Sequence, residues 1–414
     1  MTNLCVGCGI CLGLCPTNAI SLKTDRTFTV DFNHERCIKC NLCVKLCPAL
    51  SNFYREKPTI MDAVGKVEKM FFGYSKDYDI RYGGASGGVV TSLLLFMIKH
   101  KIVDRVLITK IEGLIPTSLL TDNEKEIVSA QGAIYFKTFS FRIARKILYF
   151  LEKGEKICVV GLPCQISALK TKFKKNRNHL FFIGLICSHV NELWYMSHIF
   201  DKYMPKGSKL VAIKPRKDGR PGKIKISYQS NGSLKEVTIS QHRFWNVIPQ
   251  LNLSSPLGCL VCTEHLAPSA DIVVGDAWHP KYVKDSVGTS TIIVRTSEGL
   301  KLINDAVKNN VLFVEEAKLQ DILIAHGSHF IETIEYAPFR QAILNCDVEL
   351  LKEFKHIDKI VVFLLMMLSQ FASKSKKLRL LFNGRPTEKT LKLISRFMSR
   401  SRRIRLHQIA QKIN

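Results

Sequence analysis

The chain has 414 residues, of which 46% are hydrophobic and 23% charged, and its formal net charge is +26 at pH 7. This length is ample for a hydrophobic core, so the composition fits a soluble cytoplasmic protein of two or three domains. The longest apolar run, at 360–372, is shorter than the roughly 20 residues that a membrane-spanning helix needs, which excludes a transmembrane protein.

Two cysteine-rich loops open the chain, "LCVGCGICLGLCP" at 4–16 and "RCIKCNLCVKLCP" at 36–48. Both follow the rhythm C-x2-C-x2-C-x3-C-P, in which three thiolates of one loop bind one cubane and the fourth thiolate points to the other cluster. The rhythm therefore predicts a ferredoxin-like module with two [4Fe–4S] clusters and crossed ligands. One cluster takes Cys5, Cys8, Cys11 and Cys47, and the other takes Cys37, Cys40, Cys43 and Cys15.

Zinc and disulfides are the alternatives for so many cysteines. Structural zinc usually takes two pairs of ligands separated by a longer insert, which is a different spacing. A disulfide framework is excluded because the chain is long, no signal peptide precedes the first ligand, and these loops need reduced thiolates. Glycines at positions 7, 9 and 13 suit a loop whose backbone wraps closely around sulfide.

Four zones are expected along the chain: the ferredoxin-like module at 1–52, a connector at 53–75, a main domain at 76–345 and a basic, helical tail at 346–414. The apolar patterns of the main domain predict helices at 87–100, 137–154 and 164–173, and strands at 103–109, 156–161, 180–186, 271–276 and 290–296. This alternation indicates an α/β fold with a mixed, partly parallel sheet. An Asn-Gly pair between two alternating runs at 222–240 predicts a β-hairpin.

Four further cysteines fall where sites form in α/β sheets. Cys164 follows a strand and opens a helix, Cys187 ends a strand, and Cys259 and Cys262 form a C-x2-C pair. Together they could bind a third [4Fe–4S] cluster, because strand ends and helix starts are where ligand crevices open. The alternative is that all four are structural, as Cys158 and Cys346 are expected to be in their apolar stretches.

The stretch "RYGGASGGVVTSLL" at 81–94 places four glycines and a serine before a helix. Backbone N–H groups in such a loop can face a phosphate, assisted by the helix dipole. The pattern is neither the dinucleotide fingerprint nor a P-loop, so an ordinary helix-start turn is the alternative.

Several of these motifs, taken together, resemble the family of β subunits of coenzyme F420-reducing hydrogenases and F420-dependent dehydrogenases. The motifs that carry the resemblance are "GGASGGVVTSLL", "VVGLPCQISALK", "IGLICSH" and "CLVCTEHLAPSADIVVGDAW". The resemblance spans about residues 1–300. It implies an iron–sulfur flavoprotein whose main domain binds FAD beside a [4Fe–4S] cluster. By motif, it places Ser86, Gly87, Gly88 and Thr91 at the flavin, Asp276 in the site lining, and Cys164, Cys187, Cys259 and Cys262 at the inner cluster.

The sequence departs from the family pattern at two places. Ala133 and Ile134 stand where the family has a serine and a basic residue, and Ser188-His189 replaces the usual His-Gly after Cys187. Both departures fall near expected cofactor surfaces, and they bear on whether F420 is the substrate.

The resemblance implies an oxidoreductase that exchanges electrons between its clusters and an organic hydride carrier, F420-like or other. No side-chain acid or base is required, so His189, His242 and His265 are interpreted as structural. The alternative function is an electron-transfer subunit without its own substrate that supplies electrons to a partner enzyme. In either case a ferredoxin or a partner oxidoreductase subunit is an expected partner. A bound, hydride-reducible flavin would distinguish the two.

The last 64 residues hold 16 Lys or Arg against 3 Asp or Glu, so half of the net charge lies there. A basic, partly amphipathic tail can lie on an anionic membrane, which leads us to expect peripheral attachment to the inner face of the cell membrane. An acidic partner protein or a solvated helix are the alternatives. Nucleic acid is disfavoured as a partner, because Phe382 and Phe397 are too sparse for a stacking platform.

Overall fold

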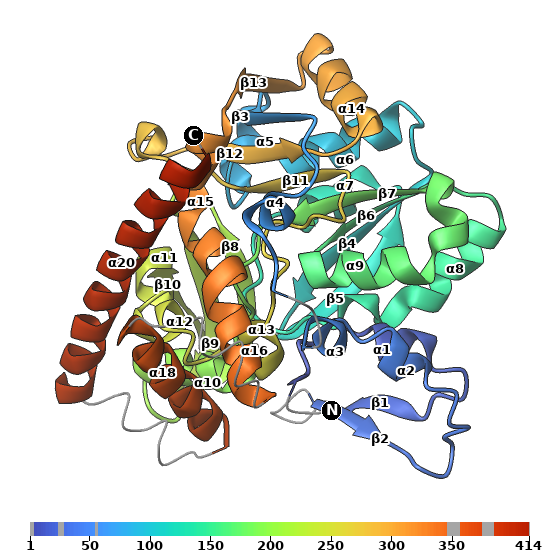
Figure 1. The fold of residues 1–414 in the computed structure, drawn as a ribbon. Coiled ribbons are helices and arrows are strands. Elements are labelled where there is room, and N and C mark those ends of the chain that lie inside the picture. The colour runs from blue at the N-terminus through green and yellow to red at the C-terminus, as the bar shows by residue number, and fades with distance from the viewer. Residues whose placement is uncertain (1–3, 24–28, 54–56, 346–356, 375–384, 414) are drawn as a thin grey trace.

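A mixed eight-stranded sheet forms the centre of the protein (Figure 1). The computed structural model describes residues 4–23, 29–53, 57–345, 357–374 and 385–413. The strand order is β13-β3-β12-β11-β7-β6-β4-β5. Strands β4, β6, β7 and β11 are parallel neighbours and the other pairings are antiparallel, which confirms the mixed α/β sheet. The strands are β3 (Lys69–Ser75), β4 (Arg105–Glu112), β5 (Ile115–Thr121), β6 (Ile157–Gly161), β7 (Leu180–Leu185), β11 (Ile272–Asp276), β12 (Ser290–Val294) and β13 (Leu312–Glu316).

Helices cover both faces of this sheet, and that is why its central strands are apolar on both sides. In β4, Val106 and Ile108 pack in one core with α6 (Val89–Lys99) and α14 (Ser297–Lys308). Leu107, between them, packs in the other core with α8 (Ala144–Glu152) and α9 (Pro163–Lys172). Cys158 of β6 is fully buried, as expected of a core residue, whereas Cys346 lies outside the described residues.

The expected elements are found with two differences. The helix expected at 137–154 begins at Ser140 with a 3-10 turn, η2 (Ser140–Ile143), before α8. The expected connector at 53–75 contains α4 (Ile60–Val64) and β3, and β3 pairs with β12 and β13 inside the main sheet. Interpreting the whole of that segment as a connector was therefore wrong. Its strand is specified by pairing with residues more than 200 positions away, and a local pattern does not contain that information.

A separate three-stranded antiparallel sheet contains the predicted hairpin. Its strands are β8 (Lys209–Lys217), β9 (Lys223–Ser230) and β10 (Ser233–Ser240). Asn231 and Gly232 form the two-residue turn between β9 and β10, both with positive φ, as the Asn-Gly signal predicts. Strand β8 also bridges to Ala133 through its residue Arg216, which brings this small sheet against the main domain.

The N-terminal module consists of α1 (Ile10–Leu14), β1 (Ile20–Lys23), β2 (Thr29–Phe32), α2 (Leu42–Lys45) and α3 (Pro48–Phe53). Its first cysteine loop is hydrogen-bonded to the main domain, since Phe139 N donates to Gly7 O at 2.7 Å and Phe141 N donates to Cys8 O at 2.9 Å. A Cβ on Gly9 would lie 2.5 Å from Phe139 O. The glycine at position 9 is therefore required by the approach of the main-domain backbone as well as by its positive φ.

The C-terminal region is helical where it is described, and it packs on the body. The helices are α15 (Leu319–Ile331), α16 (Ala337–Leu344), α18 (Ile357–Lys374) and α20 (Arg385–Ile413). Helix α20 runs along α15 (Figure 1) and buries Leu391 and Met398. Arg402 of α20 pairs with Glu332 at 2.7 Å, so the tail is part of the folded body. Among the described helices, none combines the length and apolar character needed to cross a membrane.

Shorter helices complete the fold and carry several site residues. They are α5 (Tyr78–Gly83), α7 (Glu124–Ser129), α10 (Leu193–Tyr203), α11 (Gln241–Phe244), α12 (Val247–Gln250) and α13 (Leu257–Leu260), with 3-10 turns η3 (Lys174–His179) and η4 (Pro280–Tyr282) and a π turn η5 (Glu332–Tyr336).

Candidate redox centres and cofactor cavity

Electrostatic interactions among the thiols of the N-terminal module place one cysteine of each loop with cysteines of the other loop. Burial and the neighbouring thiolates of Cys11, Cys5 and Cys47 raise the pKa of Cys8 well above its ordinary value. Burial and the thiolates of Cys5 and Cys47 likewise raise the pKa of Cys11 to about 12. Cys47, from the second loop, therefore lies with the thiols of the first loop.

The second group forms in the same crossed way. Burial, followed by the thiolates of Cys40 and Cys15, raises the pKa of Cys43. Cys15 thus lies with the second loop, although it follows the first in sequence. The thiolate of Cys43 also contributes to the raised pKa of Cys11 and of Cys47, so the two groups lie close to each other. The ligand sets and their binding of iron stay predictions.

Exchanging Cys15 for alanine tests the crossed assignment. We expect Cys15→Ala to damage the cluster held by Cys37, Cys40 and Cys43, because its thiol lies among theirs. Iron content and electron paramagnetic resonance of the reduced protein measure the loss. If the substitution instead removed only the cluster of the first loop, the ligand sets would not be crossed.

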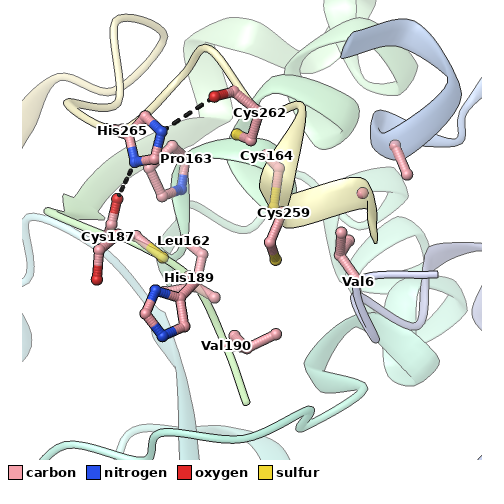
Figure 2. A pocket seen from close by; sticks show the side chains of 13 residues that line it. Val6, Leu162, Pro163, Cys164, Cys187, His189, Val190, Cys259, Cys262 and His265 are labelled. Carbon is pink, nitrogen blue, oxygen red and sulfur yellow. Dashed lines mark hydrogen bonds between the residues drawn. The ribbon is translucent and has the colours of Figure 1, made fainter. Parts of the chain in front are cut away.

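The four remaining candidate cysteines line one small cavity (Figure 2). Cys164 lies in the first turn of α9 directly after β6, and Cys187 follows β7. Cys259 lies on α13 and Cys262 just beyond it. Burial and the thiolates of Cys262 and Cys187 raise the pKa of Cys164 well above its ordinary value, so these thiols are close enough to interact.

His265 joins two of these cysteine segments. Its Nδ1 lies 2.8 Å from Cys187 O and its Nε2 lies 3.0 Å from Cys262 O (Figure 2). This histidine therefore holds the two segments in register, in agreement with its structural interpretation.

In the described part of the chain, no three His, Cys, Asp or Glu side chains converge closely enough to bind a single metal ion.

The small cavity lies directly against the N-terminal module. Val6 and Ala49 form part of its wall, and a Cβ on Gly258 would lie only 2.1 Å from Leu4 O. The thiolate of Cys8 contributes to the raised pKa of Cys164, and that of Cys5 contributes to the raised pKa of Cys259, about 11, after burial. The inner cysteine site therefore adjoins the first ferredoxin-type site.

A second, larger cavity of about 310 Å³ opens on the other side of the inner cysteine site. It lies at the carboxyl ends of β6, β7 and β11, where crevices open in parallel sheets. Both cavities are lined by Leu162, Cys187, Ser188, His189 and Val190, so one short wall separates them. A group bound in the larger cavity would be a near neighbour of the inner cysteine site.

The glycine-rich loop forms one wall of the larger cavity. Ser86, Gly88 and Thr91 line it, and Gly88 caps the start of α6 with φ 72°. Gly87 is not among the lining residues, although the resemblance implies it at the flavin. Its N–H donates to Ser290 Oγ at 2.9 Å, and a Cβ there would lie 2.6 Å from Gly73 O, so it packs the loop against β3 and β12.

An ion pair between Arg216 and Asp276 stands in the wall of the larger cavity. Arg216 Nη2 lies 2.7 and 2.9 Å from the two carboxylate oxygens of Asp276, and the arginine side chain is 1% exposed. Burial lowers the pKa of Arg216, but the carboxylate of Asp276 and the Tyr135 hydroxyl outweigh it and leave the pKa raised. Sequence reasoning found Asp276 and missed Arg216, which lies on an otherwise unremarked strand of the small sheet.

Both departures from the family pattern lie in this cavity wall. Ala133 and Ile134 line it, as do Ser188 and His189. Burial lowers the pKa of His189 to about 3, so its ring is neutral, and neither ring nitrogen has a hydrogen-bond partner among the residues that the structure describes. Trp245 packs against the ring at 5.1 Å between centroids. His189 is thus a buried polar group that a bound ligand could satisfy.

The chain combines a mixed α/β domain with two cysteine-rich loops at its N-terminus, and this arrangement is shared with a known protein family. Residues 4–50 match the family profile of a 4Fe-4S dicluster domain. Residues 70–141 and 154–320 match the N-terminal and C-terminal profiles of the coenzyme F420 hydrogenase/dehydrogenase beta subunit. The chain belongs to this family of beta subunits and carries the dicluster domain at its N-terminus.

Individual relatives are similar at lower identity. The coenzyme F420-dependent sulfite reductase of Methanocaldococcus jannaschii is 27% identical over 78% of this chain, which spans only 48% of that protein. A subunit of the F(420)H(2) dehydrogenase of Methanosarcina mazei is 25% identical over 76% of this chain and 86% of that protein. A chain of the F420-reducing [NiFe] hydrogenase complex from Methanosarcina barkeri shares the fold, with a TM-score of 0.50 and 19% identity over 68% of this chain and 93% of that chain.

Proposed function

We propose that this protein transfers electrons between an organic hydride carrier and one-electron centres, through FAD in the larger cavity and three [4Fe–4S] clusters. The observation that carries the proposal is the sequence of sites through the molecule. The larger cavity shares a wall with the inner cysteine site, and thiols of that site interact with Cys8 and Cys5 of the first ferredoxin-type site. Cys11 and Cys47 of the first site in turn interact with Cys43 of the outer one. Adjacent sites either have lining residues in common or have thiols close enough to interact electrostatically.

The chemistry of the larger cavity supports a flavin. A flavin exchanges hydride as a two-electron unit and passes single electrons to clusters. Ser86, Gly88 and Thr91 would hold it at the start of α6, where backbone N–H groups favour an anionic phosphate. His189, whose ring has no hydrogen-bond partner within the described part of the chain, would donate one ring hydrogen bond to the flavin or accept one from it.

The four inner thiols would hold the third cluster. They come from three separate segments that converge on one cavity, and no disulfide joins any of them. His265 keeps two of those segments at a fixed separation.

Anaerobic absorbance with flavin extraction tests this proposal. We expect FAD in the extract, bleaching of the flavin band by a hydride donor such as reduced F420, and about 12 iron atoms per chain from clusters of four. Protein that carries its clusters but contains no flavin would instead favour the second candidate, an electron-transfer subunit without its own substrate. F420 is the first hydride carrier to assay, because the relatives named for it match most of this chain.

The outward face of α20 supports peripheral attachment to an anionic membrane at the inner face of the cell membrane. Leu393 and Phe397 are 64% and 42% exposed on it. The exposed cations of the described side chains on this helix are Lys389, Lys392, Arg396, Arg400 and Arg403. Tail residues 375–384, with Lys376, Lys377 and Arg379, lie outside the described residues.

Charge reversal tests this attachment better than deletion, since the inner face of α20 packs on α15. We expect Arg396→Glu/Arg400→Glu to weaken binding to phosphatidylserine-containing vesicles at least about tenfold, at roughly 1 kcal/mol per surface cation. Vesicle co-sedimentation measures the affinity for the vesicles. Lys301→Glu/Lys308→Glu, at exposed positions of α14, is the matched control. Equal loss in both variants would mean that α20 is not the contact surface.

A further inference from the structure

An ion pair with a buried lysine lies where the first ferredoxin-type site meets the inner cysteine site. Lys137 Nζ lies 2.7 Å from Glu192 Oε1, and the two side chains are 6% and 22% exposed. The segments that carry them are joined directly, because Phe136 and Asn191 form a parallel β-bridge. The backbone therefore holds both charged residues in place.

The stem of Lys137 packs on the first cysteine loop. A Cβ on Gly7, which stands between Cys5 and Cys8, would lie 2.5 Å from Lys137 Cβ and 2.6 Å from its Cγ. Phe139, two residues after the lysine, donates its N–H to Gly7 O at 2.7 Å. The lysine side chain thus lies in contact with the loop that carries predicted ligands of the first site.

The two charges of the pair also act on the inner site. Burial raises the pKa of Cys259 most, while the ammonium of Lys137 lowers this pKa and the carboxylate of Glu192 raises it, the lysine having the stronger influence. Val190, two residues before Glu192, lines the inner cavity and gives the Cys259 thiol a backbone hydrogen bond. The pair therefore lies between two proposed cluster sites and faces both.

A charge at such a place changes how readily a cluster accepts an electron. Each added electron makes a [4Fe–4S] cluster more negative by one charge, so a nearby cation stabilises the reduced form and a nearby anion stabilises the oxidised form. Salt screens charges inside the protein much less than charges on its surface. The effects of Lys137 and Glu192 oppose each other, and the lysine outweighs the glutamate at Cys259.

We propose that Lys137 and Glu192 set the reduction potential of the inner cluster relative to that of the first ferredoxin-type cluster. This rests on the proposed function, which places a cluster at the inner cysteines. Lys137 makes the inner cluster easier to reduce than its buried surroundings alone would allow, and Glu192 offsets part of that effect. Both residues act through space and neither is a predicted ligand, so they are positioning residues for the electron.

Redox titration of the full-length, cluster-loaded protein, followed by electron paramagnetic resonance, tests this proposal. Lys137→Met keeps an unbranched stem on Gly7 and removes only the charge. We expect it to lower the potential of the inner cluster, so that the ratio of reduced to oxidised cluster at a fixed applied potential falls about tenfold, as one charge in a partly buried setting can produce. Glu192→Gln should raise the same ratio.

Three further variants separate the charge from the packing. Lys137→Arg keeps the positive charge and should stay near the native ratio, and Lys137→Met/Glu192→Gln, which removes both charges, should return toward it. Glu155→Gln is the matched control, because Glu155 pairs with Arg105 at 2.6 Å and its side chain is similarly exposed, at 23%. That pair lies at the amino ends of β4 and β6, away from the cavities, so the control should keep native potentials.

The sign of the two single shifts decides between an electrostatic and a structural role. Iron content is measured on every variant, and if Lys137→Met loses iron, the rise expected of Glu192→Gln decides alone. Unchanged potentials with full iron, or shifts of both single variants in the same direction, would overturn the role of the pair while leaving the proposed function standing. A native protein with only about eight iron atoms, two clusters of four, would overturn the proposed function itself and this inference with it.

Discussion

Replacing Cys259 and Cys262 together with serine should lower the iron content by about four atoms per chain, one cluster, while both ferredoxin-type signals persist. The two thiols line the inner cavity, and Cys187 and Cys164, which remain, cannot complete a four-thiolate ligand set. We expect the hydride donor still to reduce a bound flavin, and reduction of the ferredoxin-type clusters by that donor to be lost. Iron analysis and rapid-mixing spectroscopy measure the two effects separately.

Cys158→Ser is the matched control for this prediction. Cys158 is buried near the amino end of β6, where it packs in the core and lines neither cavity. The Cys158→Ser variant should keep its iron and transfer electrons as the native protein does. If Cys259→Ser/Cys262→Ser also kept all its iron while folding normally, the four inner cysteines would be structural.

Replacing Arg216 with leucine should destabilise the protein by about 3–5 kcal/mol and abolish flavin binding. The substitution leaves the Asp276 carboxylate without its counter-charge in the cavity wall. Removing one partner of a buried ion pair typically lowers the free energy of unfolding by about 3–5 kcal/mol. It also frees the Ala85 carbonyl, which accepts a hydrogen bond from Arg216 next to Ser86. Anaerobic thermal unfolding and flavin content measure the two effects.

Arg216→Leu/Asp276→Leu is the informative comparison. Removing both charges leaves no unpaired charge in the cavity wall, so most of the thermal stability should return. Flavin binding should stay weak because the cavity wall has changed. Normal thermal stability of Arg216→Leu would show that Asp276 is solvated well enough to stand alone. Unchanged flavin content in both variants would separate this ion pair from cofactor binding.

The position of α20 changes how the basic tail is understood. The charge distribution led to the expectation of a zone separate from the body. In the structure, Glu332 pairs with both Arg340 and Arg402, at 2.8 and 2.7 Å. Burial raises the pKa of Glu332, but the two arginines outweigh it and lower the pKa to about 2, so the carboxylate stays ionised at neutral pH and holds the tail on the body.

Local features of this protein follow from its amino-acid sequence. The cysteine rhythm predicts two crossed ligand groups, because the C-x2-C-x2-C-x3-C-P spacing holds three thiolates in one short loop and directs the fourth toward the other cluster. The Asn-Gly turn and most helices and strands of the main domain followed from turn chemistry and hydrophobic period, which also depend only on neighbouring residues. The family motifs identified Ser86, Gly88, Thr91 and Asp276, all of which line the larger cavity.

The contacts between distant segments became visible in the three-dimensional fold. Strand β3 lies in the main sheet because it pairs with β12 and β13, and Arg216 reaches Asp276 because β8 of a different sheet bridges to Ala133. His189 became a candidate ligand-binding residue only when its ring nitrogens proved buried and unpartnered beside two cavities. These features depend on contacts between residues far apart in the chain, and such contacts leave no period or spacing in the sequence around either partner.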